Sequence, residues 1–518
     1  MLVVPSKQML VINTPLSADI LTVIPHAKQF VHNGKHLTAV AHGMDESRVL
    51  KNLGFDVPHP IHHYYQWSGR LKPMIHQKDT AAFMASNRKA LCLNAPGTGK
   101  TLSVLWAADY LMDLGVVKKV LIIAPLSTLK PVWGTELMHH FTHRSFNMIL
   151  GTRAKREKLL DEVGIDFSIV NHDGFSTMPW LFSDYDLIIY DEVTALKSPS
   201  SQRYKKFMKF VTEHNPRLWM LTGTPISQNP TDAWTLAKLA GSTTVPRSFT
   251  QFKDLVMKRV TQFRWIPRAG ALEVCKSVLQ PSIRFSLDEC MDLPQTSYIE
   301  RRCELTTQQE KAFSVMRTEA CLAGANISAA NAAVMFQKLL QICCGVVYDT
   351  EGERVYFDDT NRIETLQEIL DEIGDKVIVY VPLRGVQDRL EKVLTKSGMD
   401  VATVHGDISK KDRDDIFDTF QNSDNIQVLL AHPRVAAHGL TLTRASNVIW
   451  YAPIHSLEQY EQANARIRRL TTEGKTAVHH VCSTSFEHQL YQRLKTKQRV
   501  LSDFLALVRG VNDQTSND

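Results

Sequence analysis

The chain has 518 residues, of which 44% are hydrophobic and 22% are charged, and this ordinary globular composition excludes a disordered, collagen-like or coiled-coil chain. Its 60 basic and 54 acidic side chains give a formal net charge of +6, which permits a nucleic-acid partner without requiring one. All apolar runs are shorter than the ~20 residues that cross a bilayer, so the sequence predicts no membrane partner.

The pattern of apolar residues divides the chain into five segments. Residues 1–70 alternate apolar and polar side chains in short stretches, which is typical of a small α+β module. Over 71–245, strand-length apolar runs alternate with helical stretches, which indicates a parallel sheet covered on both faces. Helical patterns dominate 246–355, the alternation resumes over 356–510, and a polar tail follows at 511–518. The predicted fold class is α/β, with two parallel-sheet lobes, helical insertions and a small N-terminal module.

A glycine-rich loop follows the apolar run at residues 90–93 and opens a helical stretch, with Asn94 where the usual pattern has glycine. Glycines let backbone N–H groups approach phosphates, and a helix N-terminus adds partial positive charge. Lys100 is predicted to reach the β and γ phosphates of a nucleotide, and Thr101 to hold Mg²⁺. The nucleotide-binding residues predicted here are Pro96, Gly97, Thr98, Gly99, Lys100 and Thr101.

An acidic pair, Asp191-Glu192, ends the apolar run 187–190. The carboxyl end of a strand faces the ligand crevice of an open parallel sheet. We therefore expect Asp191 to hold Mg²⁺, directly or through water, and Glu192 to activate the attacking water. An acidic pair alone is usually part of a solvated loop, but Lys100 on the same predicted sheet favours a site.

Three polar residues share a helical spacing in the second lobe. Gln462, Arg466 and Arg469 stand at i, i+4 and i+7, which brings them to one face of a helix. Arginines there could reach across a cleft and stabilise charge on a transferred phosphate. A solvated basic face is the alternative that the spacing leaves open.

The ordered segments NAPGTGKT, LIIAPLSTLKPVW, DEVTALKS, LTGTPISQNP, HGLTLTRASNVIWY and QANARIRR resemble the Swi/Snf-type DNA-dependent ATPases of helicase superfamily two. The resemblance covers residues 70–505, and the chain resembles the compact forms of bacteria and bacteriophages. It implies two RecA-like lobes, ATP and Mg²⁺ as cofactors, and catalytic roles for Lys100, Asp191, Glu192, Arg466 and Arg469.

The resemblance also implies roles for individual residues outside these motifs' catalytic positions. Gln77 is similar to the glutamine that reads adenine, and Gly439 and Gln462 join the nucleotide-binding set. The nucleic-acid contacts that it implies are Pro125, Leu126, Ser127 and Thr441.

The predicted function is an ATP-dependent motor that translocates along double-stranded DNA by sequence-independent contacts with the backbone. A strand-separating or strand-annealing motor on forked DNA, single-stranded DNA or RNA is the main alternative, because it would share every ATP residue. A binding module with an inactive ATP site and a P-loop kinase are disfavoured by the intact motif residues. The resemblance implies a cytoplasmic location in a bacterial or infected host cell and leaves protein partners open.

Overall fold

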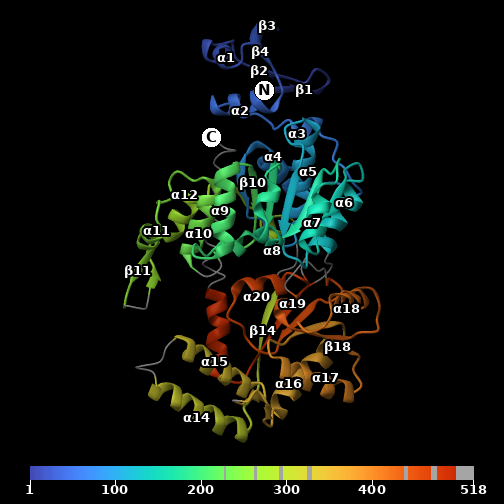
Figure 1. Ribbon diagram of the computed structural model, residues 1–518, viewed down its shortest axis with the longest axis vertical. Coiled ribbons are helices and arrows are strands. Elements are labelled where there is room, and N and C mark those ends of the chain that lie inside the picture. The colour runs from blue at the N-terminus through green and yellow to red at the C-terminus, as the bar shows by residue number, and fades with distance from the viewer. Residues whose placement is uncertain are drawn as a thin grey trace. The chain divides into compact units, whose positions relative to one another are not determined.

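The computed structural model describes residues 1–226, 229–261, 265–290, 296–323, 329–349, 351–436, 442–467 and 475–496. The chain divides into two compact units (Figure 1). The first contains Met1–Pro225 and Pro230–Phe285, and the second contains Ile226–Asn229 and Ser286–Asp503. Among the described residues, none of the helices has the length and apolar character needed to cross a membrane.

The N-terminal part of the first unit is a four-stranded antiparallel sheet in the order β1-β2-β4-β3, which packs its apolar face on short helices. Its elements are β1 (Leu2–Val4), η1 (Pro5–Lys7), β2 (Met9–Ile12), α1 (Ala18–Val23), β3 (Lys28–His32), β4 (Lys35–Ala41), α2 (Met44–Asn52) and α3 (Ile61–Tyr64). The predicted α+β character of this module is confirmed.

The rest of the first unit is built on seven parallel strands in the order β13-β5-β10-β9-β6-β8-β7. The strands are β5 (Lys89–Cys92), β6 (Val120–Ala124), β7 (Phe146–Met148), β8 (Phe167–Asn171), β9 (Leu187–Asp191), β10 (Arg217–Leu221) and β13 (Ser282–Ile283). The helices are α4 (Ile75–Ser86), α5 (Lys100–Asp113), α6 (Thr135–His140), α7 (Arg153–Leu160), α8 (His172–Thr177), α9 (Gln202–His214), α10 (Ala233–Ala240), α11 (Phe249–Val256) and α12 (Ala271–Val278).

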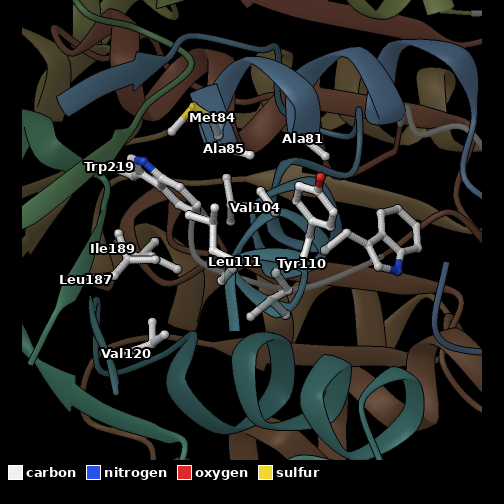
Figure 2. Packing of buried hydrophobic residues seen from close by; sticks show 14 of the residues in the cluster. Ala81, Met84, Ala85, Val104, Tyr110, Leu111, Val120, Leu187, Ile189 and Trp219 are labelled. Atoms are coloured by element: carbon white, nitrogen blue, oxygen red, sulfur yellow. The ribbon is translucent and has the colours of Figure 1, made fainter. Parts of the chain in front are cut away.

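Short helical turns complete this unit: the π-helical η2 (Leu129–Gly134) and the 3₁₀ segments η3 (Pro179–Phe182), η4 (Val193–Leu196) and η5 (Pro230–Asp232). The core lies where α4 and α5 cover the central strands, and Figure 2 shows Met84 and Ala85 of α4 near Val104 of α5 and Trp219 of β10. Every residue of β6 is buried, which explains why this strand reads as a continuous apolar run.

The segment that the sequence described as a helical insertion, 246–355, contributes to both units. Its first part forms α11, the hairpin β11 (Met257–Arg259)–β12 (Trp265–Pro267), α12 and β13, which pairs with β5 at the edge of the seven-stranded sheet. The first unit therefore continues to Phe285, past residue 245, and the segment contains strands as well as helices.

The second unit has six parallel strands in the order β14-β21-β20-β17-β19-β18 and a small β15–β16 hairpin. The strands are β14 (Ser297–Arg302), β15 (Val346–Tyr348), β16 (Arg354–Tyr356), β17 (Val377–Tyr380), β18 (Val401–Val404), β19 (Val428–Ala431), β20 (Asn447–Trp450) and β21 (Ala477–Cys482). The helices are α13 (Leu287–Cys290), α14 (Thr307–Ala323), α15 (Ala329–Cys343), α16 (Thr360–Ile373), α17 (Arg384–Lys396), α18 (Lys410–Asn422), α19 (Pro433–Ala436) and α20 (Leu457–Asn464). Two parallel sheets covered by helices confirm the predicted fold class.

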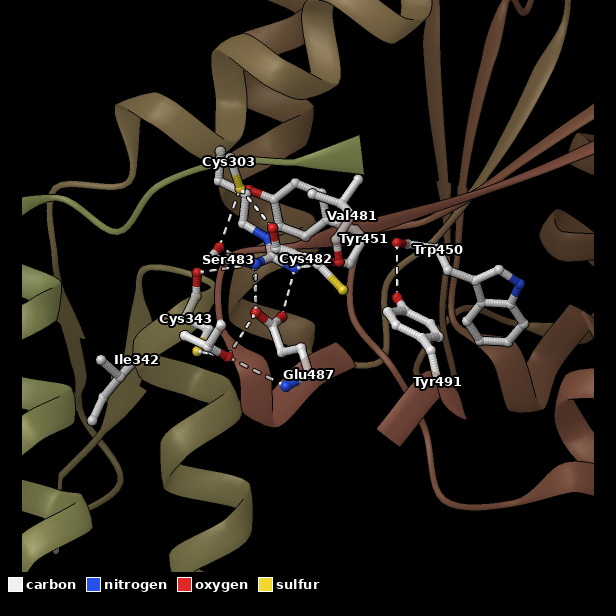
Figure 3. Close-up of polar contacts among 12 residues, drawn as sticks. Cys303, Ile342, Cys343, Trp450, Tyr451, Val481, Cys482, Ser483, Glu487 and Tyr491 are labelled. Atoms are coloured by element: carbon white, nitrogen blue, oxygen red, sulfur yellow. Dashed lines mark hydrogen bonds and ion pairs between the residues drawn. The ribbon is translucent and has the colours of Figure 1, made fainter. Parts of the chain in front are cut away.

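A buried ion pair joins distant parts of the second unit. Arg362 of α16 donates from Nη2 to Glu487 Oε1 at 2.8 Å and from Nη1 to Ser483 Oγ at 2.6 Å, and it also donates to the Tyr451 carbonyl. Glu487 in turn accepts from the Ser483 backbone N–H at 2.8 Å (Figure 3). Both charged groups are buried, and hydrogen bonds to the Arg362 Nη groups and to the Glu487 carboxylate offset part of the desolvation cost, so the pair can hold this part of the fold together.

Candidate nucleotide-binding site

The glycine-rich loop joins the end of β5 to the start of α5. Gly97 and Gly99 have φ angles of 86° and 79°, which side chains with a Cβ rarely adopt. A Cβ on Gly99 would also clash with Gln77 Nε2. Gly99 is the N-cap of α5, so backbone N–H groups and the positive end of the helix dipole face the loop. This is the local structure that binds phosphate groups.

Lys100 is the cation of this loop and is partly buried. Its Nζ donates to the Asn94 carbonyl at 2.8 Å. Burial lowers the pKa of Lys100, while the negative charges of Glu192 and Asp191 act in the opposite direction. The amine therefore lies within electrostatic reach of the acidic pair. The sequence had placed Lys100 and this pair on the same predicted sheet.

Asn94 replaces the usual glycine of the loop, and its side chain makes structural hydrogen bonds that the sequence did not indicate. The side chain is fully buried. Its Nδ2 donates to Thr80 Oγ1 at 2.9 Å, and its Oδ1 accepts from the Phe285 backbone N–H at 2.9 Å. Asn94 thus connects the loop to α4 on one side and to the segment after β13 on the other.

Gln77 lies in the first turn of α4, against the same loop. Its Oε1 accepts from the Met74 N–H at 3.0 Å, and its Nε2 donates to the Thr98 carbonyl at 3.3 Å. The neighbouring His76 also donates from Nε2 to that carbonyl, at 2.9 Å. The predicted adenine-reading residue and the predicted phosphate-binding residues are therefore brought together.

The acidic pair ends β9 at the level where β5 ends. Leu221 of β10 pairs with Cys92 of β5 on one side and with Asp191 on the other. Asp191 Oδ1 accepts from the Glu192 N–H at 3.0 Å, and its carbonyl accepts from His172 Nε2 at 2.9 Å. Burial raises the pKa of Asp191, and the Trp133 hydrogen bond and the Lys100 charge oppose that rise.

Glu192 has a left-handed backbone conformation, with φ 50° and ψ 57°. This conformation costs a residue other than glycine about 1–2 kcal/mol. It turns the chain sharply at the end of β9, so that Glu192 departs from the strand direction directly after Asp191. Such strain is typical of functional positions.

Trp133 is a site residue that sequence reasoning did not single out, although it ends the segment LIIAPLSTLKPVW. It is fully buried, and its Nε1 donates to Asp191 Oδ2 at 3.0 Å. Its backbone N–H donates to the Thr128 carbonyl at 3.2 Å, and the Thr128 N–H donates to the Pro125 carbonyl at 2.9 Å. A continuous set of contacts thus connects Asp191 to the loop that carries Pro125, Leu126 and Ser127, where Leu126 is 54% exposed.

The second unit contains the arginine motif at the end of α20. Gln462 and Arg466 are both buried, but α20 ends at Asn464, so Arg466 lies in the following turn and the two do not share one continuous helix as the spacing predicted. The Arg466 carbonyl accepts from the Leu442 N–H at 3.2 Å, which joins this motif to the end of the loop 439–442. Gly439, Thr441 and Arg469 lie outside the described residues.

The parallel sheets, the phosphate-binding loop and the acidic pair at the same sheet edge define a nucleotide-hydrolysing motor built on RecA-like lobes. Two family models match the chain: an SNF2-related domain at residues 76–345 and a helicase conserved C-terminal domain at 361–471. The chain belongs to the SNF2-related ATPases of helicase superfamily two and is a DNA-dependent, ATP-hydrolysing enzyme.

Relatives include compact bacterial and viral proteins. A putative protein p41 of Acyrthosiphon pisum secondary endosymbiont phage 1 is 25% identical over 435 residues, covering 79% of this chain and 92% of that protein. An uncharacterized ATP-dependent helicase of Bacillus subtilis is 24% identical over 473 residues, covering 83% and 80%. Among solved structures, the Sulfolobus solfataricus SWI2/SNF2 ATPase core in complex with dsDNA is 20% identical, with a TM-score of 0.42, covering 89% of this chain and 98% of that chain.

Proposed function

We propose that this enzyme translocates along double-stranded DNA by gripping the sugar-phosphate backbone, with ATP hydrolysis at the site around Lys100 and the acidic pair. The observation that carries the proposal is the position of Lys100 in the loop after β5, at the sheet edge where Asp191 ends β9 and Glu192 follows, with both carboxylates acting electrostatically on its amine. A cation and two carboxylates at one sheet edge are the parts that phosphoryl transfer requires. Membership of the SNF2-related family supports DNA as the track.

The residues of the site fit ATP and Mg²⁺. The positive φ angles of Gly97 and Gly99 and the start of α5 suit the close approach of phosphate oxygens. The Thr101 hydroxyl and the Asp191 carboxylate are the oxygen ligands that Mg²⁺ prefers. When bound, the metal ion neutralises charge on the phosphate oxygens.

Each remaining residue has a separate role in this proposal. Glu192 orients the attacking water and accepts its proton. Arg466 and Arg469 supply positive charge to the transferred phosphate. Gln77 exchanges its contacts with Met74 and Thr98 for the adenine edge, and Gly439 and Gln462 contact the nucleotide.

DNA contacts are assigned to Pro125, Leu126, Ser127 and Thr441. Backbone contacts are independent of base sequence and weaken steeply with salt. Trp133 donates a hydrogen bond to Asp191 and is connected through Thr128 to the loop that carries Pro125. The bacterial and phage relatives support a cytoplasmic location in a bacterial or infected host cell.

The test measures ATP hydrolysis by the full chain with no nucleic acid and with duplex, single-stranded, forked and RNA ligands. Duplex DNA should stimulate hydrolysis most, and displacement of a triplex-forming strand should then report directional movement. Stronger stimulation by single strands or RNA, or unwinding of forks without triplex displacement, would overturn duplex translocation in favour of a strand-separating or strand-annealing motor.

A further inference from the structure

The hairpin β11–β12 forms a two-stranded sheet separate from the larger sheets of the first unit. Figure 1 shows it extending beyond α11 and α12. Its three cross-strand pairs are Met257 with Pro267, Lys258 with Ile266, and Arg259 with Trp265. Apart from the buried Met257 and the half-buried Trp265, its strand residues are exposed, including Ile266 at 38%. A two-stranded hairpin without a third strand has only marginal stability by itself, so these exposed strands call for an explanation.

Contacts at its base hold the ribbon in place. Arg268 Nε donates to the Asp254 carbonyl at 2.9 Å and to the Met257 carbonyl at 3.0 Å. The Lys253 ammonium of α11 lies 3.8 Å from the centre of the Trp265 ring. The hairpin is therefore a fixed projection of α11.

Positive charge is concentrated on this projection. The described residues 253–261 and 265–268 contain four basic residues and one acidic residue, a net charge of +3, against +6 for the whole chain. Lys258 and Arg259 are both exposed. Within the part of the chain that the structure describes, neither has a carboxylate at ion-pair distance. Two exposed cations without an acidic partner, in a segment of positive net charge, indicate an anionic polymer as the partner.

The register places these cations on both faces of the ribbon. Adjacent residues of a strand point to opposite faces, and cross-strand partners point to the same face. Lys258 therefore lies on the face of Ile266, and Arg259 on the face of Trp265. A flat phosphate surface could neutralise one face, whereas the major groove of duplex DNA has phosphates along both walls. That groove is about 12 Å wide and admits a two-stranded ribbon.

We propose that the β11–β12 hairpin enters the major groove of double-stranded DNA, with Lys258 and Arg259 contacting phosphates on opposite walls. This proposal rests on the proposed function for duplex DNA as the track, and it adds a contact outside the ATP motifs and the family's nucleic-acid loops. The hairpin would hold the enzyme on its track without taking part in hydrolysis.

The test uses the full chain with Lys258→Gln, Arg259→Gln and both changes together. The matched control is Lys155→Gln with Lys158→Gln, two lysines of α7 in the same unit. Binding to a 30-base-pair duplex is followed by fluorescence anisotropy at several salt concentrations. The slope of log K against log salt is negative, and each lost phosphate contact should make it less steep by about 0.9. The double variant should therefore be less steep by about 1.8. Duplex affinity in low salt should fall about tenfold in the double variant, and the control should match the wild type.

Three outcomes would overturn the proposal. A double variant with the wild-type salt slope would mean that the hairpin contacts no phosphate. A loss confined to one of the two single variants would mean that one face touches DNA and that the ribbon does not enter a groove. An equal loss of affinity for single-stranded DNA would exclude a duplex groove as the target.

Thermal unfolding and hydrolysis without DNA should be unchanged in all variants, because both side chains are exposed and belong to no part of the nucleotide site. Failure of duplex DNA to stimulate the wild-type ATPase would overturn the proposed function alone, since the hairpin is judged from binding and its salt slope.

Discussion

Two clusters of opposite charges, one in each unit, differ in how many hydrogen bonds the cation makes. Arg362 in the second unit donates to Glu487, Ser483 and three backbone carbonyls. Lys100 in the first unit has three donor hydrogens, and among the described residues its Nζ makes one hydrogen bond, to Asn94. A guanidinium whose two Nη groups are both hydrogen-bonded within the fold acts as a structural tie, whereas an ammonium with donors left over can bind a ligand. The number of hydrogen bonds therefore separates the two roles, and burial agrees with it, since Arg362 is fully buried and Lys100 is partly buried.

The largest expected effect is on stability, at Arg362. Arg362→Met leaves the Glu487 carboxylate buried without its cation, which should lower the free energy of unfolding of the second unit by about 3–5 kcal/mol. Chemical denaturation followed by circular dichroism measures this change. The exposed pair Arg444–Asp424 provides the control, because Arg444→Gln should cost well under about 1 kcal/mol. Equal costs at the two sites would show that the Arg362–Glu487 pair is not a structural tie.

Lys100→Ala should give the largest effect on catalysis. Removal of a cation that meets the transferred phosphate should lower the rate of DNA-stimulated hydrolysis at least a hundredfold, while the thermal unfolding midpoint changes by a few degrees at most. Lys89→Ala, at the opposite end of β5, should keep nearly full activity. A Lys100→Ala variant with substantial hydrolysis would show that the loop is not the site of the chemistry.

Sequence patterns identified the parts of the first site that are local. The glycine-rich loop and the acidic pair each occupy a few consecutive residues, and their physical chemistry can be interpreted without knowing the partners. The contact of Trp133 with Asp191 spans 58 positions, and that of Asn94 with Phe285 spans 191. No periodicity or spacing in the chain specifies such pairs, because they depend on how β6, β9 and β13 are ordered in the sheet.

Dependence on distant partners also explains which features of the rest of the chain the sequence patterns missed. The sequence suggested helices over 246–355, but strand β13 is two residues long and is defined only by its pairing with β5. Arguments from helical spacing fail where a helix ends: Arg466 has the predicted interval from Gln462, yet α20 ends before it. Arg362 lies within an ordinary amphipathic helical pattern, so its burial could not be inferred without Glu487.

Trp133→Phe tests whether Asp191 needs the indole donor. The change keeps an aromatic ring in the core and removes one hydrogen bond to a carboxylate, which is worth about 1.5–3 kcal/mol. We expect kcat to fall about tenfold or more at saturating Mg²⁺, with a smaller change in KM. Trp219→Phe is the control, since its Nε1 donates to the Asn87 carbonyl at 3.0 Å elsewhere in the same unit. Matching losses in the two variants would assign the effect to core packing.

Asn94→Gly should give the smallest effect, which is on ATP affinity. This change also restores the residue that the usual loop sequence has at this position. Glycine at this position removes the acceptor of the Phe285 N–H and the donor to Thr80. The Thr80 hydroxyl still donates to the His76 carbonyl at 2.7 Å, so the cost falls mainly on Phe285. Each neutral hydrogen bond contributes about 0.5–1.5 kcal/mol, so we expect ATP affinity to fall less than tenfold while kcat is retained. Asn94→Asp keeps an acceptor for Phe285 and should recover most of the loss, as titration with a fluorescent ATP analogue would measure. If the aspartate and glycine variants bind the analogue equally weakly, the lost affinity is due to the hydrogen bond with Thr80 on α4. The position of Gln77 against the loop would then depend on that hydrogen bond.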